Sequence, residues 1–230
     1  MKANFLKLAV LGSLACLCVQ FTPGLKAADL EERIHTATAV LAQKQHSSDP
    51  IPNDLLAQAK GVAIFDLTKA GIGIGGVGGE GIVVTRRATT LSHFWTAPVA
   101  FNIGGGSVGA QLGFTQAKYI VVLNTDDAVQ RFLGHGKLEW NATATGTAGS
   151  TSATERVTTD ELSHREVVIY KEDSEGVFGG ATLGGATIKR KNEINRDAYG
   201  SGYRQEDLLN GKVKAPKSAD RLYQLLDGKA

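Results

Sequence analysis

The fold is decided by two glycine-rich stretches, Ala70-Gly71-Ile72-Gly73-Ile74-Gly75-Gly76-Val77-Gly78-Gly79-Glu80-Gly81 and Gly104-Gly105-Gly106-Ser107-Val108-Gly109-Ala110-Gln111-Leu112-Gly113. In the first stretch, Gly71, Gly73 and Gly75 recur every second residue, which is the period of one face of a β-strand. A third such stretch follows at Phe178–Ile188. Because glycine weakens a strand, its repeated use predicts close backbone approach, strong bending or bulges.

Around these stretches, short helical patterns alternate with strand patterns. We predict helices over residues 29–45, 53–60, 124–132 and 218–227, from apolar periodicity and capping signals. We predict strands over residues 62–67, 81–87, 94–102, 106–114, 118–123, 137–145, 165–171 and 176–190. No linker-like segment divides the chain, so the pattern predicts an α+β single domain with a glycine-rich antiparallel, barrel-like β-sheet flanked by short helices.

Residues 1–27 have the order of a secretory signal peptide. Lys2 and Lys7 flank an apolar run from Leu8 to Val19, and small residues precede a cleavage point after Ala27. The apolar run is shorter than the roughly 18–20 residues that a membrane span needs. We therefore expect an exported protein, periplasmic or extracellular, with a signal peptide over 1–27 and one domain over 28–230.

Both cysteines, Cys16 and Cys18, lie in the predicted signal segment. Cleavage after Ala27 removes both of them, which excludes disulfides from the mature domain. Ser13-Leu14-Ala15-Cys16 also resembles a lipoprotein signal, in which Cys16 carries a lipid anchor. Cleavage also changes the formal net charge from +2 to −1, because the segment holds three lysines and no acid. A near-neutral domain has little compositional support for nucleic-acid binding.

The first glycine stretch contains a formal dinucleotide-binding pattern, G-x-G-x-x-G, at Gly73–Gly78. A dinucleotide fold needs a helix directly after this pattern and an acidic residue about 20 positions further on. Here a strand pattern follows, and no acid occurs between Glu80 and Asp126. The pattern therefore favours a structural role for these glycines, and no cofactor is expected.

The second glycine stretch contains the pattern of a hydrolase nucleophile elbow, G-x-S-x-G, at Gly105–Gly109. The serine is Ser107, and possible partners downstream are Asp126, Asp127, His135 and His164. An elbow requires a helix after the serine, but the following residues contain two glycines, at about 1 kcal/mol each relative to alanine in a helix. A structural serine is the favoured interpretation, and a serine esterase is the less favoured alternative.

The histidines show no spacing that is typical of a metal site. His35, His46, His93, His135 and His164 never fall four residues apart or beside a pair of carboxylates. We therefore expect no metal and no catalytic site of this kind.

Basic residues gather in a part of the chain that has no acids. The stretch from residue 81 to residue 125 and the end of the third glycine stretch contain Arg86, Arg87, His93, Lys118 and Lys189-Arg190-Lys191. If the sheet brings these strand ends together, they form a cationic patch, in which each residue contributes roughly 1 kcal/mol near an anionic bilayer. The alternative is that they are solvated strand ends that prevent edge pairing.

Read together, these segments resemble the SYLF domain, also called the Ysc84-type actin-binding family. The resemblance covers about residues 51–200. It rests on nine stretches in the same order: Ile51-Pro52, Ala59-Lys60-Gly61-Val62-Ala63-Ile64, Lys69-Ala70-Gly71, Gly79-Glu80-Gly81-Ile82-Val83-Val84, Trp95-Thr96-Ala97-Pro98, residues 104–113, Ile120-Val121-Val122-Leu123-Asn124, Gly176-Val177-Phe178-Gly179-Gly180-Ala181 and Asn195-Arg196-Asp197-Ala198-Tyr199-Gly200.

The resemblance implies lipid binding rather than catalysis. Eukaryotic members resemble phosphoinositide-binding modules joined to SH3 or FYVE domains, some of which bind actin, whereas exported bacterial members carry the domain alone. This chain resembles the bacterial kind, so actin is an expected partner only by family analogy. Its first helix is also less basic than that of lipid-binding members.

We therefore expect an exported, non-enzymatic domain that contacts anionic phospholipid headgroups through a cationic face. The alternative is an envelope structural or protein-interaction module without lipid specificity. The expected lipid-binding residues are Lys60 and Lys69, which match the family motif, and Arg86, Arg87, Lys189, Arg190 and Lys191, which rest on charge alone.

Overall fold

The structure is a computed structural model of the 230-residue chain. It describes residues 29–90, 93–133, 138–140, 146–147, 164–174 and 186–229. The predicted signal peptide, Cys16 and Cys18, His135, and most of the third glycine stretch lie outside the described residues.

The helices of the described residues are α1 (Leu30–Gln45), α2 (Asn53–Gln58), α3 (Asp126–Leu133), α5 (Asn192–Tyr199), α6 (Gln205–Leu209), the 3₁₀ helix η2 (Lys217–Ala219) and α7 (Asp220–Leu226). The prediction for α1 is confirmed, because Asp29 caps it by accepting a hydrogen bond from the Glu32 amide at 2.9 Å. The N-cap of α2 is Pro52, which makes no side-chain capping hydrogen bond, and α5 and α6 were not predicted.

The strands are β1 (Gly61–Ala88), β2 (His93–Trp95), β3 (Val99–Leu123), β4 (Leu138–Trp140), β5 (Gly146–Thr147), β6 (Val167–Ser174) and β7 (Ala186–Arg190). They form one sheet in the order β2-β1-β3-β6-β5, and β7 pairs with β3 and β4. All pairs are antiparallel except the short β5–β6 pair. The α+β class and the antiparallel glycine-rich sheet are confirmed, and the pairings of the described strands leave this sheet open.

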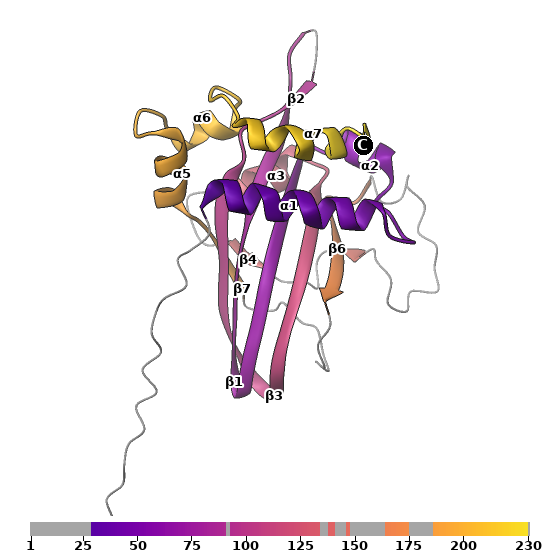
Figure 1. Ribbon diagram of the computed structural model, residues 1–230, viewed down its shortest axis with the longest axis vertical. Coiled ribbons are helices and arrows are strands. Elements are labelled where there is room, and N and C mark those ends of the chain that lie inside the picture. Colours follow the sequence, from indigo (N-terminus) through magenta and orange to yellow (C-terminus); the bar gives the residue numbers. More distant parts are fainter. Residues whose placement is uncertain are drawn as a thin grey trace, which may run out of the picture.

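The glycine-rich stretches form the middle of one long two-stranded ribbon. β1 and β3 pair from Gly61–Leu123 to Val83–Val99, with a register shift between Ile72 and Ile74. The ribbon turns back on itself at its lower end, so that the two halves of each long strand lie beside one another (Figure 1). The predicted bend and bulge are therefore confirmed.

Two glycines are required where the halves of β1 meet. A Cβ atom on Gly79 would overlap the Asp66 carbonyl oxygen, and one on Gly81 would overlap the Ile64 carbonyl oxygen. By contrast, a Cβ atom on Gly78 would have no neighbour within 4 Å. At the other end of the ribbon, the Arg86 amide donates a hydrogen bond to the Lys60 carbonyl at 2.8 Å. The halves of β1 are thus held together at both ends.

The helices cover the upper part of this ribbon. α1 lies across the long strands and α7 runs beside it (Figure 1). One core cluster packs under these helices and includes Ile34, Leu41, Ile64, Ile82 and Leu222. A second cluster lies on the opposite face, against α3 and α6, and includes Phe65, Val83, Phe101, Val129 and Leu208. Both faces of the upper part of the sheet are therefore buried, and this packing holds the strand ends in place there.

The basic residues of α1 point into the protein. Arg33 and Lys44 are each only 2 % exposed, whereas Glu31 and Glu32 are exposed. Lys44 pairs with Asp49 at 3.5 Å and lies 5.5 Å from the centre of the Tyr170 ring. The outer face of α1 therefore presents acids rather than the basic side chains that favour an anionic membrane.

No helix in the described part of the chain is both long enough and apolar enough to cross a membrane.

Candidate anion-binding cleft

A cleft of about 650 Å³ is lined by residues of α2, β1, β2 and the start of α3. Its lining residues are Ala57, Gln58, Ala59, Lys60, Arg86, Arg87, Ala88, His93, Asn124 and Asp126. Four of them carry a basic side chain and one carries a carboxylate. The cleft therefore collects more positive than negative groups on a chain whose formal net charge is only +2.

Lys60 lines this cleft, directly before the start of β1. Its amide donates a hydrogen bond to the Leu123 carbonyl at 2.8 Å, and its carbonyl accepts one from the Arg86 amide at 2.8 Å. These bonds fix the Lys60 backbone between the end of β3 and the second half of β1. The Lys60 side chain is exposed, and its amine has no partner among the described residues. It can therefore reach a ligand without breaking an internal contact.

Arg86 has a structural role in the wall of the cleft. Its Nη1 donates to the Ala57 carbonyl at 2.6 Å, and its Nη2 pairs with Asp227 at 3.0 Å. Its guanidinium also lies 4.5 Å from the centre of the Trp95 ring. Burial lowers the pKa of Arg86, and the Asp227 carboxylate opposes this shift. Arg86 thus contributes a fixed positive charge, while its contacts join α2 to the end of α7.

Arg87 is also held by internal hydrogen bonds. Its Nε donates to the Leu209 carbonyl at 2.9 Å and its Nη2 donates to Asn210 Oδ1 at 3.0 Å. The same Leu209 carbonyl accepts a hydrogen bond from the buried Thr85 hydroxyl at 2.9 Å. The end of α6 therefore fixes the position of Arg87, which adds a second preorganised charge to the cleft.

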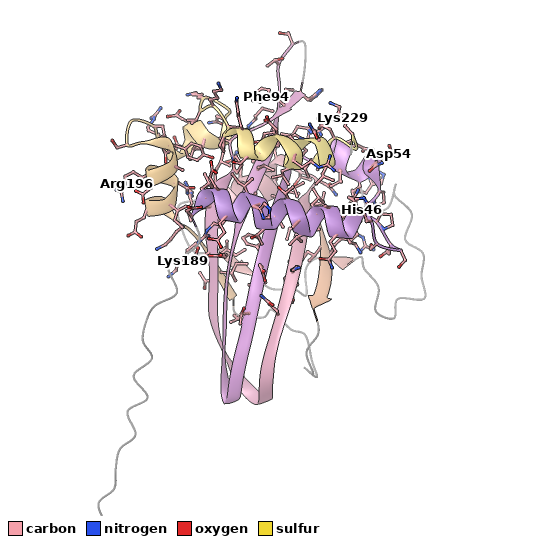
Figure 2. All side chains as sticks on the ribbon, in the orientation of Figure 1. His46, Asp54, Phe94, Lys189, Arg196 and Lys229 are labelled. Atoms are coloured by element: carbon pink, nitrogen blue, oxygen red, sulfur yellow. The ribbon has the colours of Figure 1, made fainter. Side chains whose placement is uncertain are left out.

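An aromatic side chain stands beside these basic groups. Phe94, in β2, is the register partner of Arg87 and is 37 % exposed, and His93 next to it is also exposed. Gly211, with φ of +73°, approaches Phe94 so closely that a Cβ atom there would overlap the ring. Figure 2 shows Phe94 at the upper end of the molecule. Phe94 is not one of the lining residues, so this exposed apolar ring lies next to the cleft, on the strand that also carries His93.

The other predicted lipid-binding residues lie elsewhere. Lys69 is in β1, towards the turn of the ribbon, and its side chain is not described. Lys189 is exposed on β7, well below Phe94 in Figure 2. Arg190 lies 6.0 Å from the centre of the Phe101 ring, and burial lowers its pKa. Lys191 pairs with Glu193 at 3.0 Å. The structure therefore gathers Lys60, Arg86 and Arg87 but not the β7 group.

Sequence reasoning missed the binding role of one lining residue, Asp126, and of Phe94 beside the cleft. Phe94 was placed only in a strand, and Asp126 was interpreted as a helix start and as a formal partner of Ser107. Asp126 reaches the cleft because the end of β3 pairs with the start of β1, at Leu123 and Gly61. Nothing in the local sequence indicates the strand pairing that brings Asp126 to the cleft. For Phe94, the basic residues near it in the sequence could have indicated a binding site.

The two formal catalytic patterns lie within continuous strands. Ser107 pairs with Gly75, and β3 continues as a strand to Leu123, so no helix directly follows the serine. Gly73–Gly78 is likewise followed by strand as far as Ala88. The elbow and the dinucleotide loop each require a helix directly after the pattern, and a strand stands there in both places. Among the described residues, no group of three potential metal ligands is found.

The sequence of the chain matches the model of a known family. The family model described as Las17-binding protein actin regulator, Ysc84, matches residues 104–229, just over half of the chain. The chain belongs to the Ysc84 family. This confirms the resemblance to the SYLF domain, and the Ysc84 match includes Asn124 and Asp126 of the cleft.

Similar Ysc84-family proteins occur in yeast and in mammals. LAS seventeen-binding protein 3 of Saccharomyces cerevisiae is 30 % identical over 181 residues, which cover 78 % of this chain and 39 % of the relative. SH3 domain-containing YSC84-like protein 1 of Homo sapiens is 33 % identical over 177 residues, covering 77 % of this chain and 51 % of the relative. The chain thus spans between two fifths and one half of the length of these curated relatives, whose names describe domain content and binding rather than a reaction.

Proposed function

We propose that this Ysc84-family domain is a non-enzymatic binding domain whose cleft contacts the headgroups of anionic phospholipids. The observation that carries the proposal is the gathering of Lys60, Arg87 and His93 beside the exposed Phe94. Basic side chains near an anionic bilayer contribute about 1 kcal/mol each. An exposed aromatic ring beside them suits the boundary between headgroups and acyl chains.

The free amine of Lys60 is the best candidate for direct contact. Arg86 and Arg87 each donate two hydrogen bonds within the protein, which hold their guanidinium groups in place, so they act mainly as fixed charges that attract a phosphate. We keep as a secondary contact Lys69, which matches the family motif, and the group formed by Lys189 and Arg190 of β7 and the adjacent Lys191. They lie apart from the cleft, and only Lys189 of the β7 group is exposed.

Co-sedimentation with vesicles tests this proposal. We expect the purified protein to bind vesicles that contain anionic lipid more strongly than neutral ones, and binding to weaken with salt. Lys60→Glu reverses one charge, which should weaken binding about tenfold. Lys217→Glu is the matched control, because Lys217 is exposed and does not line the cleft. If the two variants bound the vesicles equally well, the proposal that the cleft contacts the lipid would be wrong.

The second candidate function is a protein-interaction module. The family description and the name of the yeast relative refer to a Las17-binding protein and an actin regulator, which favours protein partners for the relatives. In this chain the same cleft would then receive an acidic protein segment. Co-sedimentation with actin filaments, beside the vesicle assay, distinguishes the two functions. Binding to filaments but not to vesicles would favour the second candidate.

We also propose that the domain acts outside the cytoplasm, in the periplasm or extracellular space. The support is the order of basic, apolar and small residues in 1–27. Lipidation at Cys16 would add a membrane anchor to the headgroup contacts. Mass spectrometry of the mature protein tests both points, because cleavage after Ala27 and lipidation at Cys16 leave different N-termini.

A further inference from the structure

The cleft carries a carboxylate as well as basic groups. Asp126 lines it at the start of α3, and its side chain is exposed. Its carboxylate has no ion-pair or hydrogen-bond partner among the residues that the structure describes. A purely anionic ligand gains nothing from this group and is repelled by it, so the cleft is not built for a phosphate alone.

The charged residues of the cleft lie in the same order as the neighbouring segments that carry them. Asp126 lies three residues beyond Leu123, whose carbonyl accepts the Lys60 amide, and the Lys60 carbonyl accepts the Arg86 amide. Arg87 and His93 follow on the second half of β1 and on β2. The negative group therefore lies on one side of Lys60 and the remaining positive groups lie on the other. Neighbouring strands are about 4.8 Å apart, similar to the span of a two-carbon link between a phosphate and an amine.

We propose that the cleft prefers a phosphodiester headgroup that also carries a primary ammonium group, such as phosphoethanolamine or phosphoserine. The phosphate binds at Lys60, Arg87 and His93, and the ammonium binds at Asp126. This inference rests on the proposed headgroup-binding function. It adds that Asp126 determines which headgroup is preferred, because its charge attracts an ammonium group and repels a headgroup that is only anionic.

Two soluble headgroups that differ in one group test this preference. Glycerophosphoethanolamine and glycerophosphoglycerol share the phosphodiester, but the first ends in an ammonium and the second in hydroxyls. Their dissociation constants for the full protein can be measured by NMR titration, which detects weak binding. We expect Asp126→Asn to shift the ratio of the two constants about fivefold towards glycerophosphoglycerol, the effect of roughly one unit charge at a hydrated site.

Asp127→Asn is the matched control for this change. Asp127 is the next residue of α3, is exposed and does not line the cleft, so it shares the effect of an acid in the first helical turn. The inference predicts an unchanged ratio in Asp127→Asn. A ratio that shifts equally in both variants, or in neither, overturns the role of Asp126.

Lys60→Glu separates this inference from the proposed function. If Lys60→Glu weakens both probes while Asp126→Asn leaves the ratio unchanged, the headgroup site stands and the preference is wrong. If neither probe binds, or if Lys60→Glu changes neither constant, the proposed function fails and the inference fails with it. Vesicles of phosphatidylglycerol with or without phosphatidylethanolamine identify the source of the ligand. A preference seen only with the soluble probes would exclude a lipid and leave a free phosphodiester.

Discussion

Arg33 and Glu80 form an ion pair with 2.9 Å between Arg33 Nη2 and Glu80 Oε2, joining α1 to the second half of β1. The Arg33 side chain is fully buried, whereas that of Glu80 is 38 % exposed. Arg33 Nη1 also donates to the Phe101 carbonyl at 2.7 Å and to Asn102 Oδ1 at 2.8 Å. One arginine therefore holds the first helix against both strands of the ribbon.

Removing either partner of this pair should destabilise the fold. We expect Arg33→Met to lower the free energy of unfolding by about 3 kcal/mol, because the Phe101 carbonyl loses its charged donor. Glu80→Gln should have a smaller effect, about 1–2 kcal/mol, because its side chain is partly hydrated and the other Arg33 bonds remain. Urea unfolding of both single variants and the double variant measures the coupling. Additive effects would show that the ion pair contributes nothing.

The glycine ribbon should tolerate alanine in place of Gly78, whereas alanine in place of Gly81 should destabilise the fold. Gly81→Ala places a methyl group on the Ile64 carbonyl, so we expect a loss of more than about 3 kcal/mol or failure to fold. Gly78→Ala meets no neighbouring atom, and removing a strand glycine should stabilise by about 0.5 kcal/mol. Thermal unfolding compares the two. Similar melting temperatures would mean that the halves of β1 do not approach as described.

Tyr170, like Tyr199 and Tyr223, has a raised pKa that should lower stability at high pH. Burial raises the pKa of Tyr170 to about 12, and its hydroxyl is buried with no hydrogen-bond partner among the described residues. A raised pKa means that the folded state disfavours the phenolate, so stability falls as the pH rises from about 10, the unfolded value, towards 12. We expect Tyr170→Phe to reduce this fall and to change stability at pH 7 by less than about 1 kcal/mol.

Tyr199→Phe provides the contrast, because the Tyr199 hydroxyl donates to the Pro98 carbonyl at 2.7 Å. This variant should lose about 1 kcal/mol already at pH 7. Urea unfolding at pH 7, 9 and 11 follows both variants. An equal loss between pH 9 and 11 in the wild type and in Tyr170→Phe would contradict the assignment to Tyr170.

Asp227 should couple the end of α7 to the cleft wall. Its carboxylate accepts from Arg86 Nη2 at 3.0 Å and from the Trp95 indole at 2.9 Å. Asp227→Ala leaves both donors without this acceptor, so we expect a loss of about 2 kcal/mol and a change in tryptophan emission. Asp220→Ala, an exposed change at the start of the same helix, should leave the emission unaltered. An unchanged emission in Asp227→Ala would exclude the Trp95 contact.

Local patterns predicted much of the fold. Apolar periodicity predicted α1 and α7. Leu222, Leu225 and Leu226 of α7 are buried in the structure, and the helix ends before Gly228, whose φ is +66°. The recurrence of glycine at every second residue predicted a bend in the strands and a close approach of their backbones. The short helices α5 and α6 were missed because their stability comes from tertiary contacts, such as those of Leu208 and Leu209, rather than from a long periodic pattern.

The candidate site was predictable only in part. The acid-free run pointed to Arg86 and Arg87, and the family motif pointed to Lys60, which the fold brings into the same cleft. Charge alone could not show that both arginines are held by internal acceptors. It also could not show that Lys189 lies on a different part of the sheet, because strand register decides which ends meet.

The most direct test of the headgroup contact is a measurement of which backbone amides lie near lipid headgroups. The protein is bound to anionic vesicles or bicelles whose headgroups carry a spin label, and the broadening of each amide NMR signal is recorded. The cleft proposal predicts strong broadening at Lys60, Ala88 and His93 and little at Thr187 and Lys189. Broadening concentrated at Thr187 and Lys189, or uniformly weak at all five, would contradict it.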